Sequence, residues 1–192
     1  MNSKIEFYVG WRSLINDYAI SGGWTFDGNF FVVTDSSGGV YVFDGVSGKT
    51  IWSKINAHEL GGLVVAMHPT ENKFVTTGQD GKIFIWETYK NNAQQISDLG
   101  KNWIENAAWS LDGNLLAVSC SRKVYVFSQD GEQIWTSADH TSTISNLVWS
   151  TNNEVVTSCY GRVSFFEGVT GALKQKLEWW GSLVSMVLSP ND

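Results

Sequence analysis

Three histidines, two cysteines and an aspartate in a tight corner are the residues with which this sequence could do chemistry. His58 and Asp80 could form a catalytic dyad or hold a metal ion, and the other histidines, His68 and His140, lie far from them in sequence. The two cysteines lack the C-x-x-C spacing that zinc sites favour. No G-x-S-x-G, H-E-x-x-H, phosphate-loop or dinucleotide-binding glycine motif is present. The meaning of these residues therefore depends on the elements that carry them.

Those elements are short strands separated by turns. Apolar or β-branched runs such as NFFVVTD, GGVYVFD and KIFIWE alternate with clusters of Gly, Asn and Asp. The segment ETYKNNAQQISDLG comes nearest to a helix, but its apolar residues do not recur at three and four, so we expect a loop that runs into an edge strand. The 192 residues are 43% hydrophobic and 17% charged, a balance typical of folded globular domains. The sequence predicts an all-β protein.

Two series of residues repeat with nearly the same period. The first, at intervals of 43, 41 and 39 residues, consists of aromatic residues that close a strand: Phe43, Trp86, Phe127 and Phe166. The second, at intervals of 43, 42, 40 and 39 residues, lies on the first strand of each unit: Trp24, Met67, Trp109, Trp149 and Leu188. Each period holds four strands, and one such sheet cannot bury both of its faces. Units of this length stack radially, as the four-stranded antiparallel blades of a β-propeller.

We expect one propeller domain over residues 1–192, with four full blades. The approximate blades are 15–57, 58–99, 100–139 and 140–180, with a leading strand at 4–9 and one extra first strand at 182–190. Cys120 and Cys159 then lie on matching strands of adjacent blades, too far apart for a disulfide. We expect both to be free and buried.

The second repeat resembles the repeats of the WD-repeat family of β-propellers. In that family, a His before the first strand, a Ser or Thr on the second, an Asp in the next corner and a Trp closing the third are hydrogen-bonded to one another. The matching positions here are His58, Thr77, Asp80 and Trp86. The resemblance implies a structural hydrogen-bond set, because a buried indole, imidazole and hydroxyl must all be paired. It favours this role for His58 and Asp80 over a catalytic or metal-binding one.

The resemblance also implies an incomplete ring. Rings of this family usually have seven or eight blades, about 280 residues or more at this period. An open part of a ring leaves two apolar sheet faces in water, more than the few hundred Å² that a monomer tolerates. Either four blades close on themselves, or two chains pair, or the rest of a longer protein is missing. We favour the association of two copies as a homodimer.

For function, the resemblance implies a non-catalytic scaffold that binds other proteins or peptides and needs no cofactor and no metal. The family binds partners through its narrow face, formed by the loops that join fourth to first strands and second to third strands. Candidate contact residues on these loops are Trp103, Trp180, Gln79, Arg122, Tyr160 and Arg162, and the loops also contain Ser37. Arg, Tyr and Trp dominate binding hot spots. Alternatively, Trp103 and Trp180 only cover the seams between blades.

A propeller enzyme is the alternative function. The stretch VYVFDGVSGKTIW also resembles the blade motif of quinoprotein dehydrogenases. In that motif, an Asp-x-x-x-Gly-Lys turn leads to a Trp that docks on the neighbouring blade. The motif is clear only once, and the sequence offers no carboxylate-rich site for calcium and a quinone. We therefore expect that the chain is not an enzyme.

Charge and hydropathy limit the remaining partners. The net charge is −6 and the basic residues are scattered, which argues against nucleic-acid binding. No apolar run is long enough to span a membrane, and the start MNSKIEFYVGWRS lacks a signal peptide's apolar core. We expect a cytoplasmic protein.

Overall fold

The computed structural model describes residues 10–178 and 180–189, and within these ranges the regular structure consists entirely of strands. The strands form four separate antiparallel sheets of four strands each. In every sheet, strands that follow one another in the sequence are paired. The predicted all-β class, with four-stranded antiparallel blades, is therefore confirmed.

The sheets follow the order of the sequence. The first contains β1 (Ala19–Trp24), β2 (Phe30–Asp35), β3 (Val40–Asp44) and β4 (Thr50–Lys54). The second contains β5 (Gly62–Met67), β6 (Lys73–Gly78), β7 (Lys82–Glu87) and β8 (Ala93–Asp98). The third contains β9 (Asn106–Trp109), β10 (Leu115–Cys120), β11 (Lys123–Ser128) and β12 (Gln133–Thr136). The fourth contains β13 (Ile144–Trp149), β14 (Glu154–Cys159), β15 (Arg162–Glu167) and β16 (Leu173–Glu178).

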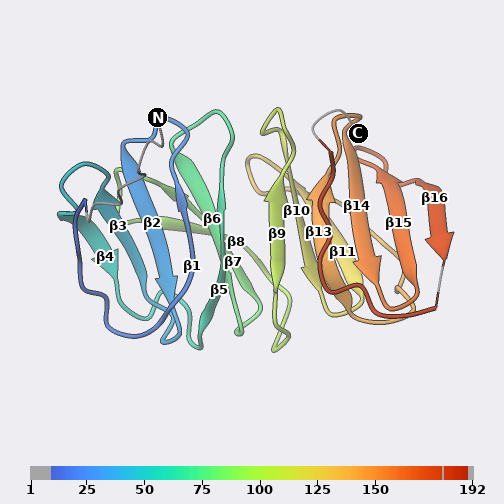
Figure 1. The fold of residues 1–192 in the computed structure, drawn as a ribbon, viewed down its shortest axis with the longest axis horizontal. Coiled ribbons are helices and arrows are strands. Elements are labelled where there is room, and N and C mark those ends of the chain that lie inside the picture. The colour runs from blue at the N-terminus through green and yellow to red at the C-terminus, as the bar shows by residue number, and fades with distance from the viewer. Residues whose placement is uncertain (1–9, 179, 190–192) are drawn as a thin grey trace, which may run out of the picture.

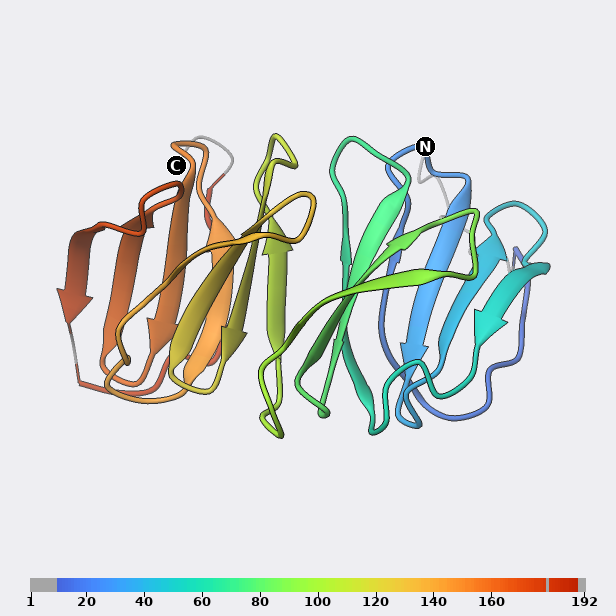
Figure 2. The same ribbon diagram turned by 180° about the vertical axis from the view of Figure 1, so that it is seen from behind.

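The four sheets stand side by side in one row (Figure 1). Their first strands, β1, β5, β9 and β13, are neighbours along the row. The first and fourth sheets lie at opposite ends of it, as the view from behind also shows (Figure 2). The arrangement is an open arc of propeller blades, and the sheets are called blades 1 to 4 below.

The hydrophobic core is divided among the seams between blades. The seam between blades 1 and 2 buries Val32 and Val42 against Phe74 and Trp86. The other two seams bury comparable sets from blades 2 and 3 and from blades 3 and 4. Residues of β2, β6, β10 and β14 are almost all buried, since the second strand lies inside its sheet and has a neighbouring blade on its faces.

Tryptophan side chains also hydrogen-bond across the seams. On the first strands, the indole N–H of Trp109 donates to Ala66 O (3.2 Å) and that of Trp149 donates to Ala108 O (2.9 Å). On the fourth strands, Trp52 donates to Thr88 O (2.7 Å) and Trp135 to Gly168 O (2.8 Å), each in the turn after the third strand of the next blade. The periodic tryptophans thus provide both apolar area and a directional contact to the neighbouring blade.

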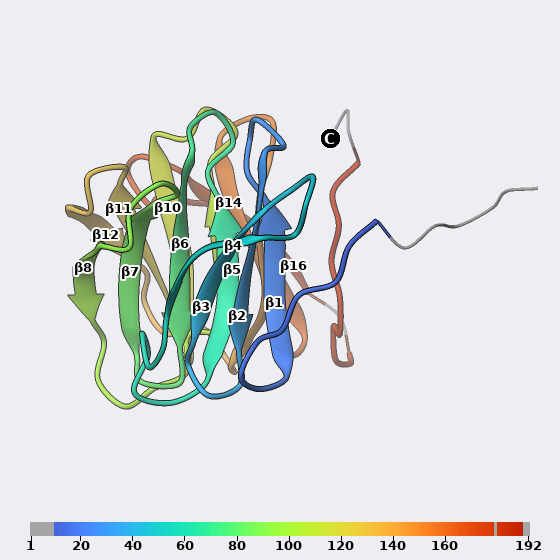
Figure 3. The same cartoon turned by 90° about the vertical axis from the view of Figure 1, so that its left-hand side faces the viewer.

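Residues 10–18 cover the free end of blade 1 (Figure 3). The Trp11 ring packs against Phe31 and Phe43, and its N–H donates to Gly45 O (2.9 Å). Gly48 has a φ of 69°, and a Cβ at this position would lie 2.5 Å from the Trp11 ring. Trp11 therefore contacts blade 1 as Trp52 contacts blade 2.

The two predicted extra strands have different outcomes. The segment 4–9 lies outside the described residues. Residues 182–189 form no strand, and residue 190 is outside the description. Asn146 Nδ2 on β13 donates to the main-chain Val184 O (3.3 Å). A first strand such as β1 pairs only with the second strand of its own blade, and the described residues offer 182–189 no such partner. The strand prediction was wrong over these residues for that reason.

Within the described residues, no helix is long and apolar enough to cross a membrane.

Replacing Trp135 by phenylalanine tests the seam hydrogen bonds. Trp135→Phe removes the donor to Gly168 O and part of the buried ring, so we expect the free energy of unfolding to fall by about 1–3 kcal/mol. The matched control is Trp180→Phe, because Trp180 is 97% exposed and its change should leave stability almost untouched. Urea unfolding followed by circular dichroism measures both. Equal losses in the two variants would contradict the role given to the seam contact.

Candidate functional site

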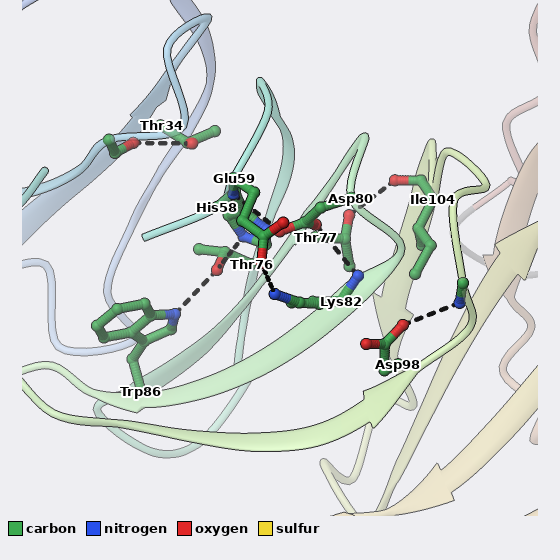
Figure 4. Close-up of polar contacts among 12 residues, drawn as sticks. Thr34, His58, Glu59, Thr76, Thr77, Asp80, Lys82, Trp86, Asp98 and Ile104 are labelled. Atoms are coloured by element: carbon green, nitrogen blue, oxygen red, sulfur yellow. Dashed lines mark hydrogen bonds and ion pairs between the residues drawn. The ribbon is translucent and has the colours of Figure 1, made fainter. Parts of the chain in front are cut away.

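His58, Thr76, Asp80 and Trp86 form one continuous hydrogen-bonded chain inside blade 2, called the His58 network here (Figure 4). The Trp86 indole N–H donates to Thr76 Oγ1 (2.9 Å), and Thr76 Oγ1 lies 2.9 Å from His58 Nε2. His58 Nδ1 lies 3.0 Å from Asp80 Oδ1. Every group is paired if Thr76 donates to Nε2 and the neutral imidazole donates from Nδ1, so the network itself assigns that tautomer.

Asp80 connects this chain to two backbone segments. Its carboxylate accepts the N–H of Lys82 (3.1 Å), which begins β7, and that of Glu59 (3.0 Å), which precedes β5. Burial raises the pKa of Asp80, but the hydrogen bonds from His58, Lys82 and Glu59 outweigh it, so the pKa lies below its ordinary value. Asp80 is therefore held as a carboxylate that pins the corner between β6 and β7 to the loop before β5.

Thr77 was predicted for this network, and that prediction was wrong by one residue. Thr77 Oγ1 donates instead to Ile104 O (2.8 Å), in the loop that leads to blade 3. Successive residues of a strand point to opposite faces, so a shift of one residue moves a side chain to the other seam. The strand register would have identified Thr76. Phe74 pairs with Trp86, and Thr76, two residues after Phe74, lies on the same face of the strand.

The His58 network leaves little room for a reactant. His58 is completely buried, and both of its ring nitrogens already have partners. Gly78 closes the site, since a Cβ there would lie 2.6 Å from His58 Nδ1. The geometry offers neither a free lone pair nor a proton to a substrate or a metal ion, and favours a structural role.

Blades 1 and 4 satisfy the corresponding positions differently. In blade 4, Thr157 takes the place of Thr76 and lies 2.9 Å from His140 Nε2. His140 Nδ1 donates to Arg122 O (3.0 Å). Burial lowers the pKa of His140. In blade 1, the buried Asp35 accepts from the Tyr41 hydroxyl (2.8 Å) and from Gly39 N (2.6 Å).

His68 is buried in the turn before β6, and both of its ring nitrogens have partners. Its Nδ1 accepts the backbone N–H of Glu71 (3.0 Å) within the turn, and its Nε2 donates to Gly113 O (3.0 Å) of blade 3. Burial lowers the pKa of His68. The second contact escaped the sequence analysis because a main-chain carbonyl on another blade leaves no signature in residue types.

Three of the predicted contact residues meet on the narrow face. β2, β14 and β16 end at the same edge of the arc, the lower edge in Figure 1, so the loops that follow them open on one side. A cavity of about 510 Å³ lies there beside blade 4, lined by Thr141, Tyr160, Gly161, Arg162, Glu178 and Trp180. The Arg162 guanidinium donates to Glu178 Oε1 (2.6 Å), and Tyr160 and Trp180 are exposed. We call this the narrow-face cavity.

The other predicted contact residues lie on loops of other blades. Arg122 Nε donates to His140 O (2.8 Å), so its guanidinium braces the loop before β13. Ser37 Oγ donates to Asp35 Oδ1 (2.9 Å), and Gln79 N donates to Gly61 O (2.9 Å). Trp103 is exposed in the loop between β8 and β9. None of these four residues lines the narrow-face cavity.

Among residues 10–178 and 180–189, no group of three or more His, Cys, Asp and Glu side chains is arranged to hold a metal ion.

The repeat that contains the His58 network matches a known family model. Residues 49–87 match the model described as "WD domain, G-beta repeat". Human WD repeat-containing protein 35 is 25% identical over 105 residues. The chain contains a WD repeat. Rat echinoderm microtubule-associated protein-like 1 is likewise 25% identical to this chain, over 140 residues.

These relatives are much longer than the part they share with this chain. The match to WD repeat-containing protein 35 covers 53% of this chain and 9% of the relative, and the other covers 70% and 17%. A solved chain from "Crystal Structure of Mitotic Checkpoint Complex" superposes with a TM-score of 0.72 at 20% identity, covering 84% of this chain and 51% of that one. At this identity the likeness shows the fold alone.

Replacing Asp80 by alanine tests the His58 network. Asp80→Ala leaves the imidazole and two backbone N–H groups without their acceptor. We therefore expect the free energy of unfolding to fall by about 1–3 kcal/mol. The control is Asp98→Ala, because Asp98 is exposed and accepts one bond, from Gly100 N.

The pH dependence gives a second check on the same variant. The folded-state pKa of Asp80 lies below 3.8, so its stabilisation is complete above that pH and is lost as the pH falls further. The difference in unfolding free energy between wild type and Asp80→Ala should therefore become smaller at acidic pH. A difference in unfolding free energy that stays constant through this range would contradict the ionised carboxylate.

Proposed function

We propose that this WD-repeat chain is a non-catalytic interaction module that binds a peptide segment of a partner protein in the narrow-face cavity. The observation that supports the proposal is the meeting of Tyr160, Arg162 and Trp180 around one cavity of about 510 Å³. These residues come from the loop between β14 and β15, from β15 and from the chain after β16, so only the folded blade brings them together.

The lining suits a peptide better than a small metabolite. Tyr160 and Trp180 offer large aromatic surfaces, and such residues give much of the free energy of binding at protein interfaces. Arg162 and Glu178 form an exposed ion pair beside them, which supplies a polar rim. The partner segment should carry an apolar or aromatic side chain flanked by polar groups.

A quinoprotein-like enzyme, the alternative from the sequence, has less support. Its chemistry needs carboxylates that converge on calcium and a quinone. The cavity contains one carboxylate, Glu178, and that group is paired with Arg162.

Peptides selected from a random displayed library on the wild-type chain provide the test. We expect Tyr160→Ala to weaken their binding at least tenfold, about 1.4 kcal/mol, because it removes an aromatic wall of the cavity. The matched control is Tyr89→Ala, since Tyr89 is equally exposed (60% against 58%) and lies in the turn between β7 and β8, away from the narrow face. Isothermal titration measures both. Losses that are equal, or larger for Tyr89→Ala, would place the binding surface elsewhere.

We also propose that two copies of this chain complete a ring, with blade 4 of each facing blade 1 and residues 10–18 of the other. The register puts Leu177 opposite Val163 and Gln175 opposite Phe165, so these four share the face turned away from blade 3. Leu177 is half exposed there, and Leu14 is exposed on the segment that covers blade 1. Contact between the two ends would remove this apolar surface from water.

Sedimentation velocity at micromolar concentration tests the association. We expect wild type to sediment as a dimer and Leu177→Glu as a monomer, because a carboxylate cannot be buried at that face without a partner. Leu111→Glu is the control, since Leu111 is exposed in the turn between β9 and β10 and lies at neither end. A compact wild-type monomer would remove the dimer from the proposal and leave the peptide site untouched.

A cytoplasmic location is part of the proposal. Cys120 and Cys159 are both free and buried, as the sequence predicts, and reduced cysteines are usual in that compartment.

A further inference from the structure

The seam between blades 2 and 3 lacks one of the repeated tryptophans. Strand pairing aligns Trp52, Gln94 and Trp135 at the same place on the fourth strands, opposite Val42, Ile85 and Val126. Gln94 Nε2 makes the same kind of contact as the two indoles, to Asp130 O in the turn of the next blade. It does so at 3.3 Å, against 2.7 and 2.8 Å for the tryptophans. An amide therefore stands where the other two seams have a large ring.

The smaller side chain leaves space. A cavity of about 700 Å³ lies at this seam, whereas the cavities at the seams on either side measure about 200 and 240 Å³. It is lined by the turn before β6, by β7 and β8, and by the turn after β11, so it opens on the edge of the arc opposite the narrow face. The cavity is thus separate from the one proposed to bind peptides.

The polar lining includes two ion pairs and one buried acceptor without a donor. Lys73 and Lys90, the two cations, are already paired with Glu71 (3.1 Å) and Glu87 (2.6 Å). Asn72 Oδ1 is buried and has no donor.

Two further acceptors come from blade 3. Gln129 Oε1 accepts only a long bond from Lys73 Nζ (3.4 Å). The carboxylate of Asp130 has no ion pair among the described residues. The two ion pairs cancel, and Asp130 leaves the lining with one net negative charge.

We propose that this cavity binds the guanidinium group of an arginine side chain from a partner protein. A guanidinium is flat, as is the indole that the seam lacks, and it carries five N–H donors and a positive charge. These donors match Gln129 Oε1 and the Asp130 carboxylate. A carboxylate ligand would be repelled by the net negative charge of the lining, and a lysine ammonium would fill less of the flat gap. The chain's net charge of −6 also favours the approach of a basic segment.

A nuclear magnetic resonance titration with acetyl-Gly-Arg-Gly-amide tests the proposal. We expect saturable shifts of the Lys73, Gln94 and Gln129 backbone amides, with the acetyl-Gly-Glu-Gly-amide peptide causing none. Gln94→Trp should fill the cavity and weaken arginine binding at least tenfold, while raising the melting temperature. Gln175→Trp is the matched control, because Gln175 occupies the same strand position in blade 4, opposite Phe165, and its change should leave binding unaltered.

Asp130→Lys is a second cavity variant. Its result does not depend on how the larger side chain of Gln94→Trp packs. Asp130 lies in a turn at the surface, and the reversed charge should also weaken arginine binding at least tenfold. The proposal is overturned if the arginine peptide causes no saturable shift up to about 10 mM. It is equally overturned if the glutamate peptide binds as well, or if both cavity variants bind as wild type does. None of these outcomes bears on Tyr160 and the narrow-face cavity.

Discussion

Each four-stranded sheet of this chain has two apolar faces, and only contact with neighbouring sheets can remove both from water. The faces alone specify little about orientation, because apolar contact is non-directional. Direction comes from the indole N–H groups that reach a carbonyl on the adjacent blade, from Trp52, Trp135, Trp109 and Trp149. A blade that slid along its neighbour would lose these bonds and leave carbonyls unpaired. The stacking of flat sheets is thereby converted into one defined arc.

The same requirement explains why the architecture could be predicted from the sequence. A seam needs large flat residues at fixed positions on the first and third strands. These positions therefore recur with the period of the repeat and can be recognised in the sequence alone. The segment 182–190 shows where this reasoning fails. Its apolar residues follow the first-strand series up to Leu188, but a strand also needs hydrogen-bonding partners, and series of side chains carry no information about those.

The site was less predictable, for two physical reasons. Spacing alone cannot choose between Thr76 and Thr77, because the choice depends on which face of β6 meets Trp86. The contacts of His68, and of Arg122 with His140, end on main-chain carbonyls, which every residue has. The sequence indicates loop positions for Tyr160, Arg162 and Trp180. Their meeting around one cavity depends on where the strands of blade 4 end.

The contact between Trp11 and Gly48 makes the two ends of the arc unequal. Trp11 acts at blade 1 as a substitute for a neighbouring blade: it places a ring and an N–H donor where a fourth-strand tryptophan would stand. Blade 4 has Gln175 at its corresponding outer position, and among the described residues no ring covers it. In a linear array whose units are stabilised by their neighbours, local opening begins at the less protected end. In a single copy of the chain, amide protons of β14 and β15 should accordingly exchange with solvent faster than those of β2 and β3, so the arc opens first at blade 4.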